Sequence, residues 1–217
     1  MRKKELEIIL EGVEDLSEAD VRSEQYMTPA VVAAELLHFA FMRGELSGVV
    51  YDLGCGTGIL AIGAKLLGAK KVVGVDKDAR CIEVARKNAK KLGVSVEFLC
   101  CDVRDVRAMA ADVVVMNPPF GAQRSNRRAD RIFLKKALEI APIVYTIHNA
   151  GSEPFIRKFI SPHVITHKIN AKFPLKRRFH FHKKDVKVIE VEIYRLEGRK
   201  EREKELRQGF ISRKLSN

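Results

Sequence analysis

Two kinds of segment alternate along the chain. Short, mainly apolar runs are typical of buried strands, and we predict strands at residues 48–53, 70–76, 94–102, 111–120, 142–148, 164–175 and 185–197. Between them lie stretches with apolar residues at helical spacing, and we predict helices at residues 3–11, 29–42, 59–69, 78–93, within 127–141 and at 152–161. Regular alternation of strand and helix predicts a mostly parallel sheet with helices on both faces.

The ends of the predicted elements refine this picture. No helix separates the last two strands, so we expect them to close the sheet as an antiparallel hairpin. Thr28 and Pro29 are typical of a helix N-cap followed by proline at the first helical position. We divide the chain into an N-terminal helix and lead-in (1–23), one α/β domain (24–196) and a charged basic tail (197–217), which we interpret as an accessory arm.

Composition narrows the class of protein. The 217 residues contain 40 Lys and Arg against 28 Asp and Glu, a net charge of +12, which favours a polyanionic partner. No apolar run approaches the roughly 18 residues that span a bilayer, and "MRKKELEIIL" lacks the apolar core of a signal peptide. We therefore expect a cytoplasmic protein without membrane contact. The four cysteines lack zinc-site spacing, so we expect no metal and interpret them as small buried apolar residues.

A candidate ligand site follows the first strand of the domain. In "YDLGCGTG", Asp52 precedes glycines 54, 56 and 58, which allow a tight turn and close approach of a ligand. The spacing is tighter than in a pyrophosphate-binding fingerprint. Asp76 ends the next strand, where a carboxylate can accept two ribose hydroxyls, and Asp102 ends the third, near where an adenine amino group would lie. Each aspartate has a helix cap as its ordinary alternative role.

This arrangement resembles the class I S-adenosylmethionine-dependent methyltransferases over roughly residues 24–195. The resemblance implies a Rossmann-like α/β fold with a seven-stranded, mostly parallel sheet whose last strand is antiparallel. It also implies that the cofactor is S-adenosyl-L-methionine, whose amino-acid portion the three glycines would approach. Asp76 would then hold the ribose, and Asp102 the edge of the adenine.

The stretch "NPPF" (117–120) follows a buried strand and matches the motif of amino-group methyltransferases. An exocyclic amine is a poor nucleophile because its lone pair is delocalised into the ring. The Asn117 side-chain oxygen and the Pro118 carbonyl can accept its two N–H groups and stabilise the developing charge. The two prolines hold these acceptors rigidly, and Phe120 offers a face for stacking a base. We therefore take Asn117, Pro118 and Phe120 as candidate catalytic residues.

The chain also resembles the archaeal and eukaryotic small-subunit ribosomal RNA adenine-N6 methyltransferases. The resemblance rests on four stretches that occur in this order: "EQYMTP", "DLGCGTGIL", "MNPPFG" and "FHFHKKDVKVIEVEIYRL". The resemblance implies that a Q-Y-x-T element folds over the cofactor. It also makes a small zinc-binding activator protein, with which eukaryotic members work, a candidate partner. The cofactor-binding residues it implies, together with the acidic and glycine positions above, are Gln25, Thr28, Asp52, Gly54, Gly56, Thr57, Gly58, Ile59, Asp76, Asp102, Val103 and Asn117.

Two basic stretches flank the candidate site, "QRSNRRADR" (123–131) and "KFPLKRRFHFHKK" (172–184). The second interleaves its positive charges with Phe173, Phe179 and Phe181, and such a mixture suits phosphates and unpaired bases. An adenine swung out of a loop, bulge or junction would fit this arrangement. Our candidate RNA contacts are Arg124, Arg127, Arg128, Lys176, Arg177, Arg178, Phe181, His182, Lys183 and Lys184. For His148, at a strand end, both contact with substrate and a structural role stay open.

The function most consistent with these patterns is adenine-N6 methylation of RNA, most specifically of small-subunit ribosomal RNA. The alternative is a protein glutamine N5-methyltransferase, which carries a similar motif, usually with Tyr at the last position. Its substrate would need to be ribosome-associated or a translation protein to suit a charge of +12. A DNA adenine methyltransferase would usually carry a separate recognition domain. A non-catalytic module that keeps the fold would not need the intact glycine loop and "NPPF".

Overall fold

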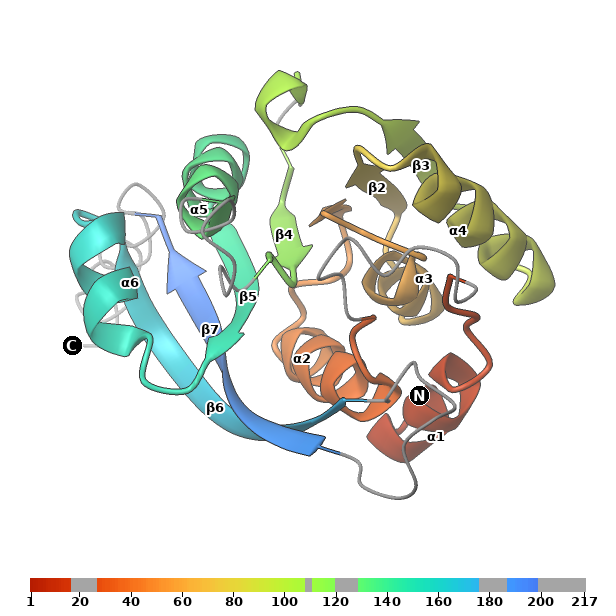
Figure 1. The fold of residues 1–217 in the computed structure, drawn as a ribbon, viewed down its shortest axis with the longest axis horizontal. Helices are drawn as coiled ribbons and strands as arrows, with labels where there is room; N and C mark the ends of the chain where they lie inside the picture. The colour runs from red at the N-terminus through yellow and green to blue at the C-terminus, as the bar shows by residue number, and fades with distance from the viewer. Residues whose placement is uncertain (17–26, 108–110, 120–128, 176–186, 199–217) are drawn as a thin grey trace, which may run out of the picture.

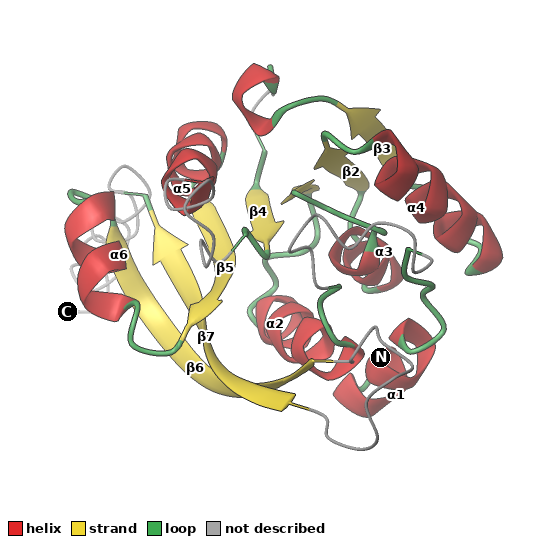
Figure 2. Ribbon diagram, viewed as in Figure 1, coloured by secondary structure: helices red, strands yellow, loops and turns green. Residues whose placement is uncertain are grey.

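The computed structural model describes residues 1–16, 27–107, 111–119, 129–175 and 187–198. Its seven strands form one sheet in the order β3-β2-β1-β4-β5-β7-β6, drawn in yellow in Figure 2. The strands are β1 (Val49–Leu53), β2 (Lys71–Asp76), β3 (Glu97–Cys100), β4 (Val113–Met116), β5 (Ile143–Asn149), β6 (Val164–Leu175) and β7 (Lys187–Glu197). The first five pair in parallel, and β7 runs antiparallel to β5 and β6. The predicted sheet, including its closing hairpin, is confirmed.

Helices cover both faces of the sheet, as Figure 1 shows. One face carries α1 (Lys3–Leu10), α2 (Ala30–Met42), α3 (Ile59–Leu66) and α4 (Ala79–Lys91). The other carries α5 (Ala129–Ile140), α6 (Glu153–Ile160) and the short 3-10 helix η1 (Val103–Asp105). Each face has its own hydrophobic cluster, which is the packing that the alternation of strands and helices predicts.

The central strand β4 is completely buried. All four of its residues, Val113–Met116, are at most 1% exposed, and the strand lies between β1 and β5. Continuous apolar sequence is what a parallel strand covered on both faces requires. The residue that follows β4 is therefore held by a rigid part of the core.

Helix α2 begins one residue later than predicted. Pro29 is the N-cap, with φ −61° and ψ 144°, and its carbonyl accepts hydrogen bonds from the N–H groups of Val32 and Ala33. The side chain of Thr28 makes no cap. A proline can occupy this position because the cap contributes its carbonyl to the helix, whereas its own N–H is not needed. The hydroxyl of Thr28 is left available for a partner elsewhere.

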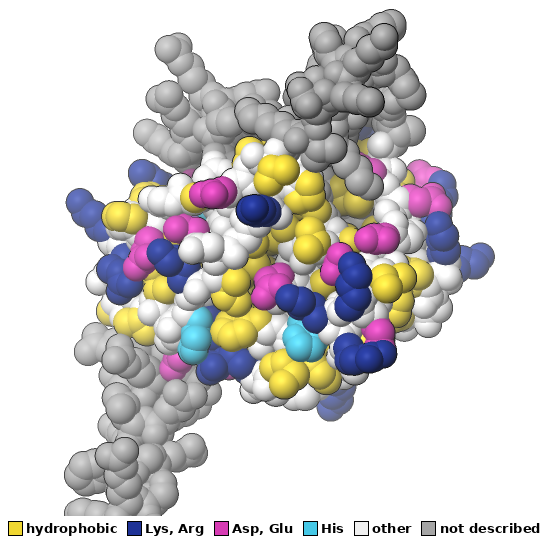
Figure 3. All heavy atoms as spheres, turned by 90° about the horizontal axis from the view of Figure 1, so that it is seen from below, with side chains coloured by type: hydrophobic (Ala, Val, Ile, Leu, Met, Phe, Trp, Pro, Cys, Tyr) yellow, Lys and Arg dark blue, Asp and Glu magenta, His cyan; other side chains and the backbone are white. Residues whose placement is uncertain are grey.

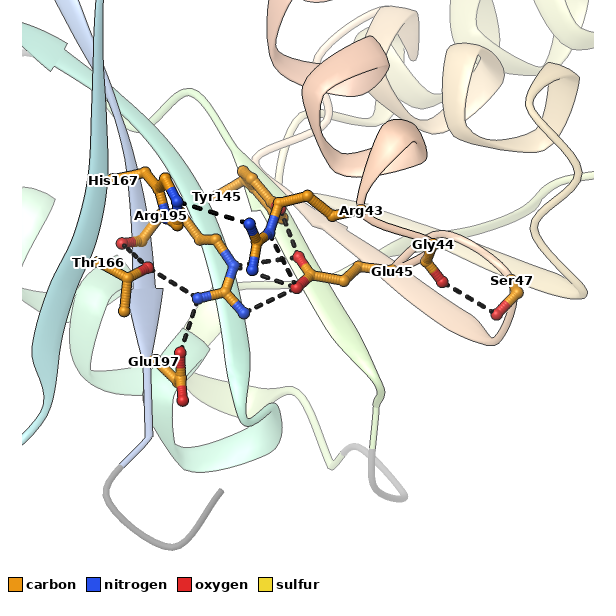
Figure 4. A network of polar contacts seen from close by, with 9 residues as sticks. All are labelled: Arg43, Gly44, Glu45, Ser47, Tyr145, Thr166, His167, Arg195 and Glu197. Atoms are coloured by element: carbon orange, nitrogen blue, oxygen red, sulfur yellow. Dashed lines mark hydrogen bonds and ion pairs between the residues drawn. The ribbon is translucent and has the colours of Figure 1, made fainter. Parts of the chain in front are cut away.

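A buried ionic network ties the hairpin β6–β7 to the loop between α2 and β1 (Figure 4). The Arg195 side chain is 2% exposed and donates to Glu45 at 2.7 Å, to Glu197 at 2.7 Å and to Thr166 at 2.7 Å. Tyr145 on β5 also donates to Glu45. Because one guanidinium satisfies groups from separate segments, the antiparallel end of the sheet is fixed to the parallel part.

The structure corrects the interpretation of two cysteines. Cys55 and Cys81 are buried as expected, whereas Cys100 is exposed and Cys101 is partly exposed. Cys100 ends β3 and Cys101 follows it, and β3 is an edge strand of the described sheet, where side chains are less covered than at its centre. Within the described ranges, no helix is long and apolar enough to cross a membrane.

Candidate active site

Asp52 and the glycine loop, Asp76 and Asn117 lie at the carboxyl ends of β1, β2 and β4, whereas Asp102 and Val103 follow β3. The order of the sheet reverses between β1 and β4, because β2 and β3 lie on one side of this pair and β5 on the other. In an open α/β sheet, such a reversal leaves a crevice in which ligands bind. The glycine loop that follows β1 and the "NPP" segment that follows β4 therefore border the same crevice.

The glycine loop is bound to the end of β2. The N–H groups of Gly54 and Cys55 donate to the Val75 carbonyl at 2.8 and 2.9 Å. Gly54, Gly56 and Gly58 have φ values of 72°, 51° and 92°, all in the left-handed region that favours glycine.

The three glycines differ in what surrounds them. A Cβ at Gly54 would lie 2.8 Å from Phe133, and a Cβ at Gly58 would lie 3.1 Å from Ala85. At Gly56 a Cβ would meet no atom of the described residues within 4 Å. Packing alone thus accounts for two of the glycines, and Gly56 is the one that borders open space. That Gly54 and Gly58 also approach the cofactor stays a prediction.

Within the described part of the chain, two buried oxygen atoms in this region have no hydrogen-bond partner. Asp52 is 1% exposed, and its Oδ2 accepts the Ala61 N–H at 2.9 Å while its Oδ1 accepts nothing. The Oγ1 of Thr57, which is 4% exposed, also lacks a partner. Burial raises the pKa of Asp52 to about 8, and the nearby charge of Asp76 contributes to this. Buried polar atoms are normally satisfied, so these two atoms agree with the prediction that Asp52 and Thr57 meet a ligand, which stays a prediction.

Asp76, at the end of β2, holds the backbone of the glycine loop. Its Oδ2 accepts the Gly56 N–H at 2.9 Å, and its Oδ1 accepts the Asp78 N–H at 2.9 Å. Burial raises the pKa of Asp76. Asp78 itself is the N-cap of α4. Contact between Asp76 and the ribose of a cofactor stays a prediction.

Asp102 has a strong local partner. Its carboxylate accepts from the guanidinium of Arg104 at 2.8 and 2.9 Å and from the Arg104 N–H at 2.9 Å, and it caps η1. The hydrogen bonds from this side chain and backbone lower the pKa of Asp102 to about 2. The cap interpretation is therefore realised here. The proposed contact with adenine would have to use an oxygen that Arg104 also holds.

Asn117 lies immediately after β4, where its side chain meets Thr28 from the start of α2. The Nδ2 of Asn117 donates to Thr28 Oγ1 at 2.9 Å, and Thr28 is 6% exposed. The Oδ1 of Asn117 is buried and has no partner among the residues that the structure describes. Pro118 is buried and Pro119 is partly buried. The site therefore presents an unused amide acceptor on a rigid support, as the "NPPF" interpretation requires.

Three further candidates lie in the interior. Ile59 (3% exposed) belongs to the core beneath α3, and Val103 (8% exposed) belongs to the opposite core. His148 is 4% exposed, its Nε2 lies 2.9 Å from Thr146 Oγ1, and its ring packs beside Tyr194. Burial lowers the pKa of His148 to about 4, so this ring is neutral at neutral pH. These contacts favour the structural role for His148.

Asn88 on α4 organises the site but was not among the predicted residues. It is 1% exposed, and its Nδ2 donates to the Thr57 carbonyl at 3.0 Å and to the Glu14 carbonyl at 2.9 Å. Its Oδ1 accepts the Glu14 N–H at 3.0 Å. The chain that leads out of α1 is thereby attached to the glycine loop. The sequence carried a signal, because Asn88 lies on the otherwise apolar stripe of α4 with Cys81, Ile82 and Ala85.

Several candidates fall outside the described residues: Gln25, Phe120 and all ten candidate RNA contacts, which lie within 120–128 and 176–186. For Phe173, the interpretation as a base-stacking residue is wrong. Its ring is 0% exposed and packs in the core beneath the hairpin. The residue belongs to the β6 alternation of inward and outward side chains, and its inward position makes it part of the fold.

Charges of both signs are interspersed around hydrophobic side chains on the face shown in Figure 3. Residues 120–128, 176–186 and 199–217 together contain fifteen of the 40 Lys and Arg but four of the 28 Asp and Glu. Much of the positive surplus therefore belongs to segments that flank the described core in sequence.

Comparisons with known proteins agree with this geometry. The model of the methyltransferase small domain family matches residues 31–141. The uncharacterized protein MJ0284 of Methanocaldococcus jannaschii is 44% identical over 210 residues, which cover 91% of this chain and 94% of that protein. The rRNA N(6)-adenosine-methyltransferase METTL5 of Danio rerio is 32% identical over 207 residues, covering 90% of this chain and 98% of that protein. The crystal structure of PH1948 from Pyrococcus horikoshii, a candidate RNA methyltransferase, has a TM-score of 0.82 at 42% identity, covering 91% and 98% of the two chains.

The fold and the site define an S-adenosyl-L-methionine-dependent methyltransferase. The chain belongs to the methyltransferase small domain family. Within that family it groups with MJ0284 and METTL5, which it matches over nearly their full length. The residues fit the cofactor. Asp52 and Thr57 offer buried polar atoms without partners, and Gly56 borders open space. An ionised Asp52 would also suit the positive charges that the cofactor carries.

Proposed function

We propose that this protein transfers a methyl group to N6 of an adenine in RNA, and that the RNA is small-subunit ribosomal RNA. The observation that carries this proposal is the buried, unpartnered Oδ1 of Asn117, which follows a rigid strand and precedes two prolines. The relatives named as rRNA N(6)-adenosine-methyltransferases match over nearly their full length and support RNA as the substrate.

The chemistry explains why an acceptor is needed at this place. The N6 amino group of adenine donates two hydrogen bonds, and its lone pair is delocalised into the ring. Two acceptors that hold both N–H groups favour a pyramidal nitrogen and turn the lone pair out of the ring plane. As the nitrogen gains a bond to carbon it becomes positive, and the same acceptors then bind it more strongly than in the ground state.

Asn117 Oδ1 and the carbonyl of Pro118 are the two acceptors in this proposal. Asn117 is fixed at the end of β4, and the ring of Pro118 restricts both its own φ and the backbone of Asn117. The acceptors therefore need little reorganisation when the amine arrives. S-Adenosyl-L-methionine, when bound at the glycine loop, supplies the electrophilic methyl group.

The proposal requires no side chain that acts as a general base. The methylated nitrogen is initially cationic, and an N-methylated aminopurine cation loses its proton readily to water. His148 has its Nε2 beside Thr146 Oγ1 and a pKa of about 4, so it is a weak base within a structural contact. At saturating RNA and cofactor, the maximal rate should therefore not follow the ionisation of a histidine near pH 6.5.

RNA would be held by two basic segments, at 120–128 and 176–186. In sequence, the first directly follows the candidate acceptors, and the second joins β6 to β7. Lys and Arg contribute affinity for phosphates, and interleaved Phe and His can stack on unpaired bases. A small zinc-binding protein stays a candidate partner on the resemblance to eukaryotic members.

The experiment is transfer of labelled methyl from S-adenosyl-L-methionine to total RNA from cells that lack this protein, followed by nucleoside mass spectrometry. We expect N6-methyladenosine in the small-subunit rRNA fraction. Label confined to another RNA would overturn the small-subunit assignment while preserving the reaction. Label absent from RNA but present in a ribosome-associated or translation protein would support the glutamine N5 alternative.

A further inference from the structure

The side chain of Asn117 needs a partner beyond its own strand. Its backbone is held by β4 and by the proline that follows, but the torsion that turns the amide plane is broad and roughly two-fold. An amide has an acceptor end and a donor end. With the oxygen toward the adenine amine it accepts an N–H, whereas with the NH2 group in that place two donors would face each other.

Thr28 occupies one end of this amide. Its Oγ1 accepts from Asn117 Nδ2 at 2.9 Å across a separation of 89 residues, and the opposite end, Oδ1, is the one without a partner. The contact sets the plane of the amide and leaves the acceptor end for another molecule. The reverse orientation would aim the NH2 group at the substrate amine.

The support behind Thr28 is itself rigid. The residue directly precedes the cap of α2, whose residues Val32, Ala33, Leu36 and Leu37 are at most 1% exposed. Position 28 is thus fixed by a core helix on one side of the crevice and Asn117 by a core strand on the other. A hydrogen bond between two such supports holds the acceptor within the small tolerance that catalysis allows.

We propose that Thr28 is a positioning residue that acts through Asn117 and presents its Oδ1 to the substrate amine, an inference that rests on the proposed function. The role differs from the cofactor contact that the Q-Y-x-T resemblance implies. A cofactor contact would be felt in cofactor affinity, whereas a positioning contact is felt in the maximal rate, because the substrate amine meets a misplaced acceptor only in the reacting complex.

The test uses the full chain, with total RNA from cells lacking the protein as methyl acceptor. Thr28→Val keeps the size of the side chain and removes the hydroxyl. We expect its maximal rate to fall about tenfold and its dissociation constant for S-adenosyl-L-homocysteine to stay within about twofold. Thr28→Ser restores the hydroxyl and should recover the rate to within about threefold of wild type. Thr166→Val, which removes a hydroxyl bonded to Arg195 far along the sheet, is the matched control and should leave the rate unchanged.

A double variant makes the test specific. If Thr28 acts only through Asn117, Thr28→Val in an Asn117→Ala background should cause less than about a twofold further loss. A full additional tenfold loss of rate in the double variant would overturn the proposal. The proposal would also be overturned if Thr28→Val had the wild-type rate, or if it lost only affinity for S-adenosyl-L-homocysteine. Asn117→Ala measured alone tests the proposed function separately. A rate near wild type there would contradict the role of Asn117 whatever Thr28 does.

Discussion

Asp52 is a buried acid whose ionisation should oppose folding when no cofactor is bound. Its folded-state pKa of about 8 lies well above the ordinary value of 3.8, because burial disfavours the charged form. Between these two pH values the folded protein retains a proton that the unfolded chain has released. Stability therefore falls as pH rises through this window, by about 1.4 kcal/mol per pH unit at most, and levels off above about pH 8.

The perturbation is Asp52→Asn, which removes the charge and can keep an oxygen for the Ala61 N–H, now accepted at 2.9 Å. The amide NH2 would occupy the place of the unpartnered Oδ1. Any penalty from this group is the same at every pH, so the slope rather than the offset is diagnostic. Relative to wild type, the variant should gain stability steadily between about pH 5.5 and about pH 7.5, by roughly 2–3 kcal/mol in all.

Urea unfolding of the cofactor-free protein across that pH range measures this difference directly. Asp102→Asn is the matched control. Arg104 holds the pKa of Asp102 near 2, so its carboxylate is ionised throughout, and the loss on substitution should not vary with pH. A stability difference for Asp52→Asn that is equally flat would refute the assignment of Asp52 as a proton-retaining acid in the free protein.

Other substitutions test the fold and the glycine loop. Arg195→Met should lower the free energy of unfolding by about 3–5 kcal/mol in urea denaturation, because the buried Glu197 would lose its cation and the partly buried Glu45 would keep only Arg43; a loss under about 1 kcal/mol would contradict the network's role. Gly56→Ala should cost about 1 kcal/mol in stability. It should also weaken S-adenosyl-L-homocysteine binding at least about tenfold by calorimetry, because the added Cβ would point into the open space where we expect the cofactor. Gly58→Ala should lose more stability than Gly56→Ala, because its Cβ would crowd Ala85; equal losses would argue against this packing.

The sequence was sufficient for the sheet because its signals are local and repeated. Each parallel strand is an apolar run, and glycines 68 and 93, with φ of 99° and 66°, follow α3 and α4. The glycine spacing and "NPPF" are also local signals, and they were sufficient to predict where the crevice lies. Contacts between distant segments could not be read in this way. The bond between Thr28 and Asn117 joins two elements whose approach only the folded chain determines.

Burial decided the positions that pattern alone misjudged. Phe173 is the same residue type as a base-stacking phenylalanine, but its position in the alternation of β6 directs its ring into the core. Cys100 lies on an edge strand, and the position of β3 in the sheet cannot be deduced from its own residues. Asn88 is an exception, since a polar residue on an apolar helical stripe is a visible signal of a buried hydrogen-bonding role.

The measurement that tests the central claim most directly is the rate of N6-methyladenosine formation in small-subunit rRNA by wild type and by Asn117→Ala. The buried, unpartnered Oδ1 of Asn117 predicts that the variant is slower by about two orders of magnitude or more. Its affinity for S-adenosyl-L-homocysteine, measured in parallel, separates the loss of the acceptor from the loss of the cofactor contact that the resemblance also implies for Asn117. A variant rate within about threefold of wild type would contradict the account, because Asn117 would then not be the acceptor on which the reaction depends.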